Sequence, residues 1–115
     1  MAQKRILFVD DDSIWREFAE ILLGEFELFF AENGKEALDK IKEDSFDLII
    51  TDTEMPVMNG KELIIYLKAH FPEMSIIMIS SLDHYKNWAD GQGICFISKE
   101  FFISLLPMEV KKILN

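Results

Sequence analysis

The sequence alternates short apolar runs with amphipathic segments along its whole length. Five of these runs are four or five residues long and rich in Ile, Leu, Val and Phe: Arg5–Val9, Leu28–Ala31, Leu48–Thr51, Ser75–Ile79 and Ile94–Ile97. Runs of this length and composition predict strands that are buried on both faces. Strict alternation of such strands with helices indicates a parallel sheet, covered by helices on both faces and joined by right-handed crossovers.

The segments between the runs predict the helices. The first is expected to follow an Asp12 or Ser13 cap and to carry an apolar stripe of Ile14, Phe18, Ile21 and Leu22. The turn residues Asn33-Gly34 lead into a second helix, and a third is expected from Lys61 to about His70.

The last two helical segments are less regular. Asp83–Asp90 has weak periodicity and predicts a brief helix at best. Pro107 suits the first turn of a final helix, in which Val110, Ile113 and Leu114 form the apolar face.

Acidic residues follow two of the predicted strands. Asp10 and Asp11 come directly after the first strand, and Asp52 follows the third. Five-stranded sheets of this class most often have the order 2-1-3-4-5, which places a crevice above the carboxyl ends of strands 1 and 3. We therefore expect the three carboxylates to meet in that crevice.

Such a group of carboxylates favours a hard cation. Mutual repulsion would raise their pKa values unless a cation is bound, and Mg²⁺ prefers oxygen ligands, often together with a phosphate. Ser80 and Lys99 end the fourth and fifth strands and reach the same edge of the sheet. A metal anchor, a nucleophilic carboxylate, a hydroxyl donor and a fixed positive charge are typical of phosphoryl transfer, which depends on positioning and charge neutralisation.

Composition narrows the classes of partner and location. The 115 residues suit one domain, residues 1–115, and the formal net charge of −9 argues against nucleic acid or an anionic membrane as a direct partner. No apolar run approaches the roughly 20 residues that span a bilayer, and the first run is too short for a signal peptide. Cys95 has no cysteine partner, and a cytoplasmic protein fits these features.

Four motifs at four successive strand ends carry a family resemblance. They are V-D-D at 9–11, D-T-E-M-P-V-M-N-G at 52–60, I-S-S at 79–81 and I-S-K at 97–99. The chain resembles a response-regulator receiver domain of two-component signalling, of the stand-alone type similar to chemotaxis regulators. The resemblance covers nearly the whole chain and implies the flavodoxin-like (βα)5 fold, an α/β doubly wound parallel sheet.

The resemblance also implies a role for each residue of the site. Asp52 would be the phosphorylated residue, with Asp11 a direct Mg²⁺ ligand and Asp10 acting largely through water. The main-chain carbonyl of Glu54 would complete the protein ligands, together with Asp52 itself. Ser80 and Lys99 would contact phosphoryl oxygens. The phosphoryl group would come from a sensor histidine kinase, a phosphotransfer protein or a small acyl phosphate, and the domain would hydrolyse its own aspartyl phosphate without acting on external substrates.

The implied output is a change of surface that a downstream protein target reads. Phosphorylation would pull Ser80 and its loop inward, and an aromatic side chain on strand 5 would change rotamer. This remodels the face of helix 4, strand 5 and helix 5. Phe96 stands where that aromatic is expected, either as the switch or simply as part of the core.

Three departures from the family pattern affect these expectations. Glu100 replaces the usual proline after the lysine, so we predict a trans peptide bond and a rearranged Lys99 loop, because a cis bond without proline costs roughly 2.5–4 kcal/mol. The segment from Ser80 to Gly93 is short, which predicts a short or irregular helix 4. Glu54 places a carboxylate beside the path of an attacking water and could alter autodephosphorylation.

Two other functions compete with an active receiver. One is a degenerate receiver that binds partners without phosphorylation, although the set Asp10, Asp11, Asp52, Ser80 and Lys99 is intact. The other is a small Mg²⁺-dependent phosphatase that uses Asp10 as its nucleophile, since an apolar strand followed by D-x-D occurs at Val9–Asp12. Such enzymes need a longer chain and a second acidic pair late in the sequence, where only Lys99-Glu100 is found.

Overall fold

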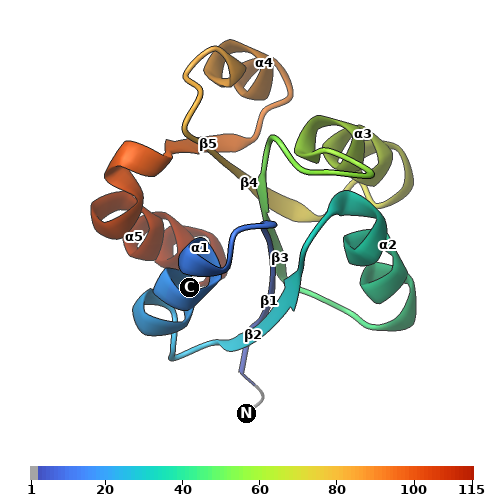
Figure 1. Cartoon of the computed structure of the whole chain (residues 1–115). Helices are drawn as coiled ribbons and strands as arrows, with labels where there is room; N and C mark the ends of the chain where they lie inside the picture. Colours follow the sequence, from blue (N-terminus) through green and yellow to red (C-terminus); the bar gives the residue numbers. More distant parts are fainter. Residues whose placement is uncertain (1–2) are drawn as a thin grey trace.

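The computed structural model describes residues 3–115 and shows five parallel strands in the order β2-β1-β3-β4-β5 (Figure 1). The strands are β1 (Arg5–Val9), β2 (Glu27–Ala31), β3 (Leu48–Asp52), β4 (Ser75–Ser80) and β5 (Cys95–Ser98). Each neighbouring pair is parallel and in continuous register. The predicted order and the flavodoxin-like fold are confirmed, and the predicted strand ends differ from the observed ones by at most one residue.

Helices cover both faces of this sheet. They are α1 (Ser13–Leu22), α2 (Gly34–Glu43), α3 (Gly60–His70), α4 (Tyr85–Gly91) and α5 (Phe102–Leu114), with a short 3₁₀ turn η1 (Lys99–Phe101) before α5. Helices α1 and α5 lie on one face, α2 and α3 lie on the other, and α4 lies beyond the β5 edge (Figure 1). No helix among residues 3–115 has both the length and the apolar character needed to cross a membrane.

Side chains that alternate along each strand divide the core into two clusters. In β1, Leu7 and Val9 pack with residues of α2 and α3, whereas Ile6 and Phe8 pack with residues of α1 and α5. All five residues of β3 are buried, as expected for the central strand of a doubly wound sheet. The sheet thus holds the carboxyl ends of its strands in fixed positions.

The apolar stripe predicted for α1 is partly wrong. Asp12 caps the helix as expected, accepting a hydrogen bond from the Ile14 amide, but the Ile14 and Ile21 side chains are 48% and 77% exposed. The inward face instead includes the buried Ala19 and Leu23. A shift of the buried stripe by one position around the helix explains the difference, because positions three and four apart share a face.

The predicted start of the last helix is also wrong. Helix α5 begins at Phe102, so Pro107 lies inside it rather than in its first turn. Proline lacks the amide that would bond to the carbonyl of Ile103, yet Phe102 and Leu106 are fully buried and hold this part of the helix against the sheet. Helix α4 has seven residues, which confirms the prediction of a short helix.

Candidate functional site

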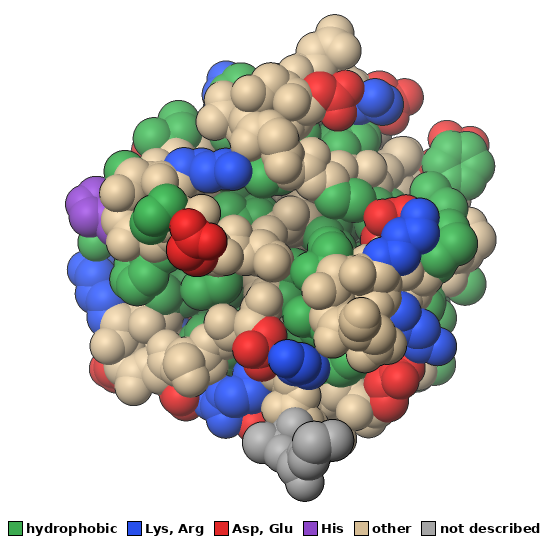
Figure 2. Space-filling view, turned by 180° about the vertical axis from the view of Figure 1, so that it is seen from behind, with side chains coloured by type: hydrophobic (Ala, Val, Ile, Leu, Met, Phe, Trp, Pro, Cys, Tyr) green, Lys and Arg blue, Asp and Glu red, His purple; other side chains and the backbone are tan. Residues whose placement is uncertain are grey.

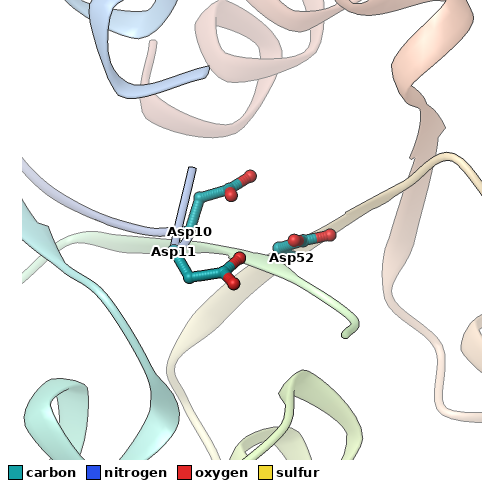
Figure 3. Close-up of side chains that lie close together, drawn as sticks. All are labelled: Asp10, Asp11 and Asp52. Atoms are coloured by element: carbon teal, nitrogen blue, oxygen red, sulfur yellow. The ribbon is translucent and has the colours of Figure 1, made fainter. Parts of the chain in front are cut away.

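Three carboxylates meet where β1 and β3 end. Asp10 and Asp11 follow β1, Asp52 is the last residue of β3, and one oxygen from each lies within 4.8 Å of the others (Figure 3). Asp10 is fully buried and Asp52 is 7% exposed, whereas Asp11 is exposed and faces solvent. The predicted meeting of these residues at the crevice between adjacent parallel strands is therefore observed.

Lys99 supplies the positive charge of the site from the end of β5. Its Nζ lies 2.9 Å from Asp10 Oδ2 and 3.3 Å from Asp52 Oδ2, and only 9% of the side chain is exposed. One ammonium thus pairs with two carboxylates of a group of three, so the site is net negative when all three are ionised. This arrangement favours a second positive charge.

The environment raises the pKa values of the two buried carboxyls. The pKa of Asp52 is raised to about 6, first because burial penalises its charged form and then because the Asp10 carboxylate is close. Burial likewise raises the pKa of Asp10, although the Lys99 ammonium opposes the change. A bound cation would stabilise the charged forms of both carboxyls.

The donor set of this site fits Mg²⁺. Asp10 Oδ2 is buried and lies 2.9 Å from Lys99 Nζ, and it accepts no hydrogen bond from any other described residue. A buried carboxylate oxygen beside two further carboxylates, in a group that is exposed on the Asp11 side, matches the preference of Mg²⁺ for oxygen ligands and retained water. The role of the Glu54 main-chain carbonyl as a Mg²⁺ ligand stays a prediction.

Ser80 is buried at the end of β4, and its hydroxyl is engaged within the protein. Its Oγ lies 2.8 Å from Thr53 Oγ1 and accepts a hydrogen bond of 2.9 Å from the Leu82 amide. Thr53 also donates its amide to Asp52 Oδ1 at 2.8 Å. Thr53 therefore links Asp52 to Ser80. The sequence analysis did not assign this role, although Thr53 directly follows Asp52.

The peptide bond after Lys99 is trans, as the sequence predicts, and the rearrangement of the Lys99 loop relative to the family stays a prediction. No peptide bond among the described residues is cis, and Lys99 begins the short 3₁₀ turn η1. The Ser98 hydroxyl accepts a hydrogen bond from the Glu100 amide, while the Glu100 side chain is exposed. The chain then continues directly into α5.

Two residues of α1 contact the site and were not assigned a chemical role from the sequence. Arg16 donates a hydrogen bond of 2.7 Å to the main-chain carbonyl of Asp10. The ring of Trp15 has its centroid 4.8 Å from Lys99 Nζ. Both lie in the first two turns of α1, which begins directly after the acids. Their closeness to the acids in sequence is the feature from which contacts with the site could have been predicted.

The face beyond β5 includes the predicted switch residue. Phe96 is half-buried and packs against the same apolar cluster as Tyr85 and Trp88 of α4. The Tyr85 hydroxyl donates a hydrogen bond of 2.7 Å to Glu54 Oε2, so α4 is tied to the loop that follows Asp52. The role of Phe96 as a switch stays a prediction.

A doubly wound 2-1-3-4-5 sheet with acids at the ends of β1 and β3 and a lysine after β5 defines a receiver domain. The chain belongs to the response regulator receiver domain family, which it matches over residues 6–110.

Proteins of known sequence agree with this assignment. A protein-glutamate methylesterase/protein-glutamine glutaminase of Desulfotalea psychrophila is 43% identical over 86 residues, covering 71% of this chain and 24% of that protein. The transcriptional regulatory protein CrdR of Helicobacter pylori is 29% identical, covering 98% of this chain and 56% of CrdR. The chain thus spans about a quarter to about half the length of these relatives.

Solved structures show the same fold over almost the entire chain. The response regulator TrrA of Thermotoga maritima, crystallised with Mg²⁺-BeF, has a TM-score of 0.88 at 35% identity, and the match covers 96% of this chain and 99% of TrrA. The chemotaxis protein CheY4 of Vibrio cholerae gives a TM-score of 0.85 at 28% identity, and the match covers 98% of this chain and 100% of CheY4. TrrA has also been crystallised in complex with the histidine kinase ThkA.

Proposed function

We propose that this chain is a phosphorylation-controlled signalling switch that accepts a phosphoryl group on Asp52 with Mg²⁺. The observation that carries the proposal is the position of Asp52, which is buried at a strand end within 4.8 Å of two further carboxylates and 3.3 Å from Lys99 Nζ. Nothing in a purely structural role requires acidic groups to be concentrated in this way. Residues 1–115 act as one receiver domain in this proposal.

The chemistry follows from the groups around Asp52. A carboxylate oxygen of Asp52 attacks the phosphorus of the donor, the bond between phosphorus and the donor atom breaks, and its electron pair leaves with the donor. Asp10, Asp11, Asp52 and the Glu54 carbonyl would hold Mg²⁺, which supplies neutralisation of the charge on the phosphoryl oxygens. Lys99 is placed to pair with one of these oxygens.

The readout begins at Ser80. Its hydroxyl is hydrogen-bonded to Thr53, and a phosphoryl group on Asp52 would offer new acceptor oxygens beside it. A turn of Ser80 toward the phosphoryl group would draw the β4–α4 loop inward, since the Leu82 amide is bonded to the same hydroxyl. Phe96 and the surface of α4, β5 and α5 would then rearrange and present a changed face to a downstream protein.

Exposed apolar side chains support a protein as phosphoryl donor. Four of them lie on segments that follow the carboxyl ends of β1, β3, β4 and β5: Ile14, Val57, Leu82 and Phe101. Apolar side chains at the edge that bears the acids favour docking of another protein there. A sensor histidine kinase or phosphotransfer protein fits, and the complex of TrrA with a histidine kinase supports this class of donor.

Charge supports an output through protein contact rather than through nucleic acid. The net charge is −9, and the face of the molecule in Figure 2 shows acidic and basic side chains interspersed, with no extended basic patch on that side. Direct binding to a polyanion needs such a patch, because phosphate neutralisation supplies most of its affinity.

Incubation with Mg²⁺ and acetyl phosphate, followed by intact-mass measurement, tests the proposal. The wild type is expected to gain the mass of one phosphoryl group, and the gain should vanish in Asp52→Asn. Asp39→Asn, which alters an exposed carboxylate on α2, is the matched control and should behave as the wild type.

Two other outcomes would contradict the proposal. A wild type that takes up no phosphoryl group in the presence of Mg²⁺ would be a binding module only. A label that persists in Asp52→Asn and maps to Asp10 would instead indicate a phosphatase that uses Asp10 as its nucleophile.

A further inference from the structure

The Lys99 ammonium contacts groups of two different kinds. It lies 2.9 Å from the carboxylate of Asp10 and 3.3 Å from that of Asp52. It also lies over the ring of Trp15, with 4.8 Å between Nζ and the ring centroid. This distance lies within the range of a cation–π contact, which strengthens when the cation is desolvated, as Lys99 is here.

Trp15 is itself braced by an aromatic chain that reaches the centre of the sheet. Its ring packs against Phe102, with centroids 5.1 Å apart, and Phe102 packs edge-on against Phe8 of β1 at 6.1 Å. Phe8 and Phe102 are fully buried. The indole therefore has little freedom to move, and it presents a rigid surface to the ammonium.

The lysine side chain needs such a surface. It is a flexible stem of four carbons. Lys99 is also the first residue of the short 3₁₀ turn η1 and is followed by Glu100. Its other close partners are two carboxylates, and one of them, Asp52, changes its charge when it is phosphorylated. The Trp15 ring is uncharged, and phosphorylation of Asp52 leaves it unaltered.

We propose that Trp15 is a positioning residue for phosphoryl transfer, holding the Lys99 ammonium beside Asp52 so that it meets the incoming phosphoryl oxygen. This inference rests on the proposed function of Asp52. Trp15 does not touch the reacting atoms and acts only through Lys99. What matters is its aromatic face, since an apolar side chain without a π system would fill space but would not attract the ammonium.

The comparison of Trp15→Leu with Trp15→Phe isolates that face. In Trp15→Leu, the rate of phosphorylation by acetyl phosphate, corrected for the folded fraction, should fall roughly two- to thirtyfold. Trp15→Phe retains a π face and should recover most of the rate. A merely structural role predicts no such rescue once folding is accounted for.

Trp88→Leu is the matched control. Trp88 on α4 also lies beside an ammonium, that of Lys61 at 5.2 Å from its ring centroid, but this lysine is exposed and belongs to α3. The same substitution therefore removes the same kind of contact away from Lys99. Its phosphorylation rate should stay at the wild-type value.

A double-mutant cycle of unfolding tests the contact itself. Trp15→Leu and Lys99→Met are measured singly and together by urea denaturation. If the indole and the ammonium interact, Trp15→Leu should change the unfolding equilibrium less in the Lys99→Met background than in the wild type, by roughly two- to thirtyfold.

Three results would overturn the inference: a wild-type rate for Trp15→Leu, an equal loss for Trp15→Phe and Trp15→Leu, or an additive cycle. A wild type that takes up no phosphoryl group would contradict the proposed function instead. The unfolding cycle would still decide whether Trp15 holds Lys99, so the two failures are distinguishable.

Discussion

At the scale of single residues, Val57 has a backbone conformation that its side chain disfavours. Its φ angle is 69°, in the left-handed region, and among the described residues it is the only one other than glycine with a positive φ. The side chain is β-branched and 80% exposed, so packing does not explain the choice of valine. This strained residue lies in the loop between Asp52 and α3.

Val57→Asn is expected to stabilise the protein by roughly 1 kcal/mol, because asparagine tolerates the left-handed region that costs most other residues about 1–2 kcal/mol. Urea denaturation measures the change. Val57→Ile keeps the β-branch and should leave the stability unchanged. A loss of stability in Val57→Asn would show that the loop gains from valine in some other way.

Cys95 provides a second prediction at this scale. Burial, together with the nearby Glu109 carboxylate, raises the pKa of the Cys95 thiol to about 11. Since the thiolate is the reactive form, alkylation by iodoacetamide should be slow at pH 8 and rise about tenfold per pH unit until the pH approaches 11. Mass spectrometry at a series of pH values gives the midpoint.

Glu109→Gln is the control for that measurement. It removes the negative charge beside the thiol, so the midpoint should move to lower pH. A wild-type midpoint near pH 9, the ordinary pKa of the thiol, would contradict the half-buried position of Cys95 beside Glu109.

At the scale of elements, α3 has the most fully defined start in the molecule. The Asn59 side chain accepts from the Glu62 amide, and the Glu62 side chain accepts from the Asn59 amide, which completes a capping box. Gly60 follows at a point where a Cβ atom would overlap the main-chain carbonyl of Asp52. The start of α3 is therefore packed directly against the residue that we propose is phosphorylated.

Asn59→Ala should lower the free energy of unfolding by about 1 kcal/mol, because it leaves a helix-terminal amide without its partner. Thermal or urea denaturation measures the loss. Asn87→Ala, at an exposed position in α4 that makes no side-chain hydrogen bond among the described residues, should change stability far less. Equal losses in the two variants would argue against the capping box as the cause.

The elements also show where sequence reasoning succeeds and where it does not. Strands were predicted to within one residue at their ends, because fully buried strands of a parallel sheet appear as uninterrupted apolar runs. The buried faces of the helices were harder to predict. In α1 the apolar positions do not all point inward, and Ile21 is exposed because Ala19 and Leu23 occupy the buried face. The start of α5 was missed because Pro107 is tolerated inside it.

At the scale of the whole molecule, the site is a product of topology. Asp11 and Asp52 are distant in sequence, and parallel pairing of β1 with β3 brings them together. That convergence was predictable from the pattern of strand ends. The contacts of Thr53 with Ser80 and of Trp15 with Lys99 were not, because they depend on side-chain directions that no periodicity specifies.

Mg²⁺ should stabilise the folded protein as a whole. A ligand that binds only the native state at 100 times its Kd adds about 2.7 kcal/mol to the free energy of unfolding. Tm should therefore rise with Mg²⁺ concentration and fall again when EDTA is added. The rise should be much smaller in Asp11→Asn, whereas Asp39→Asn on the surface of α2 should keep it. Equal responses of the two variants would place the ion elsewhere.

Glu25 contacts residues from both ends of the described chain. Gln3 donates a hydrogen bond of 2.9 Å to its main-chain carbonyl, and Lys111 of α5 lies 3.7 Å from its side chain. Glu25 precedes β2, so this meeting point lies at the edge of the sheet where the strands begin, opposite the acids. Reporter groups or surface tethers attached near Gln3 or Lys111 would therefore leave the edge that bears the acids free, and a short linker between these two segments is geometrically feasible for circular permutation.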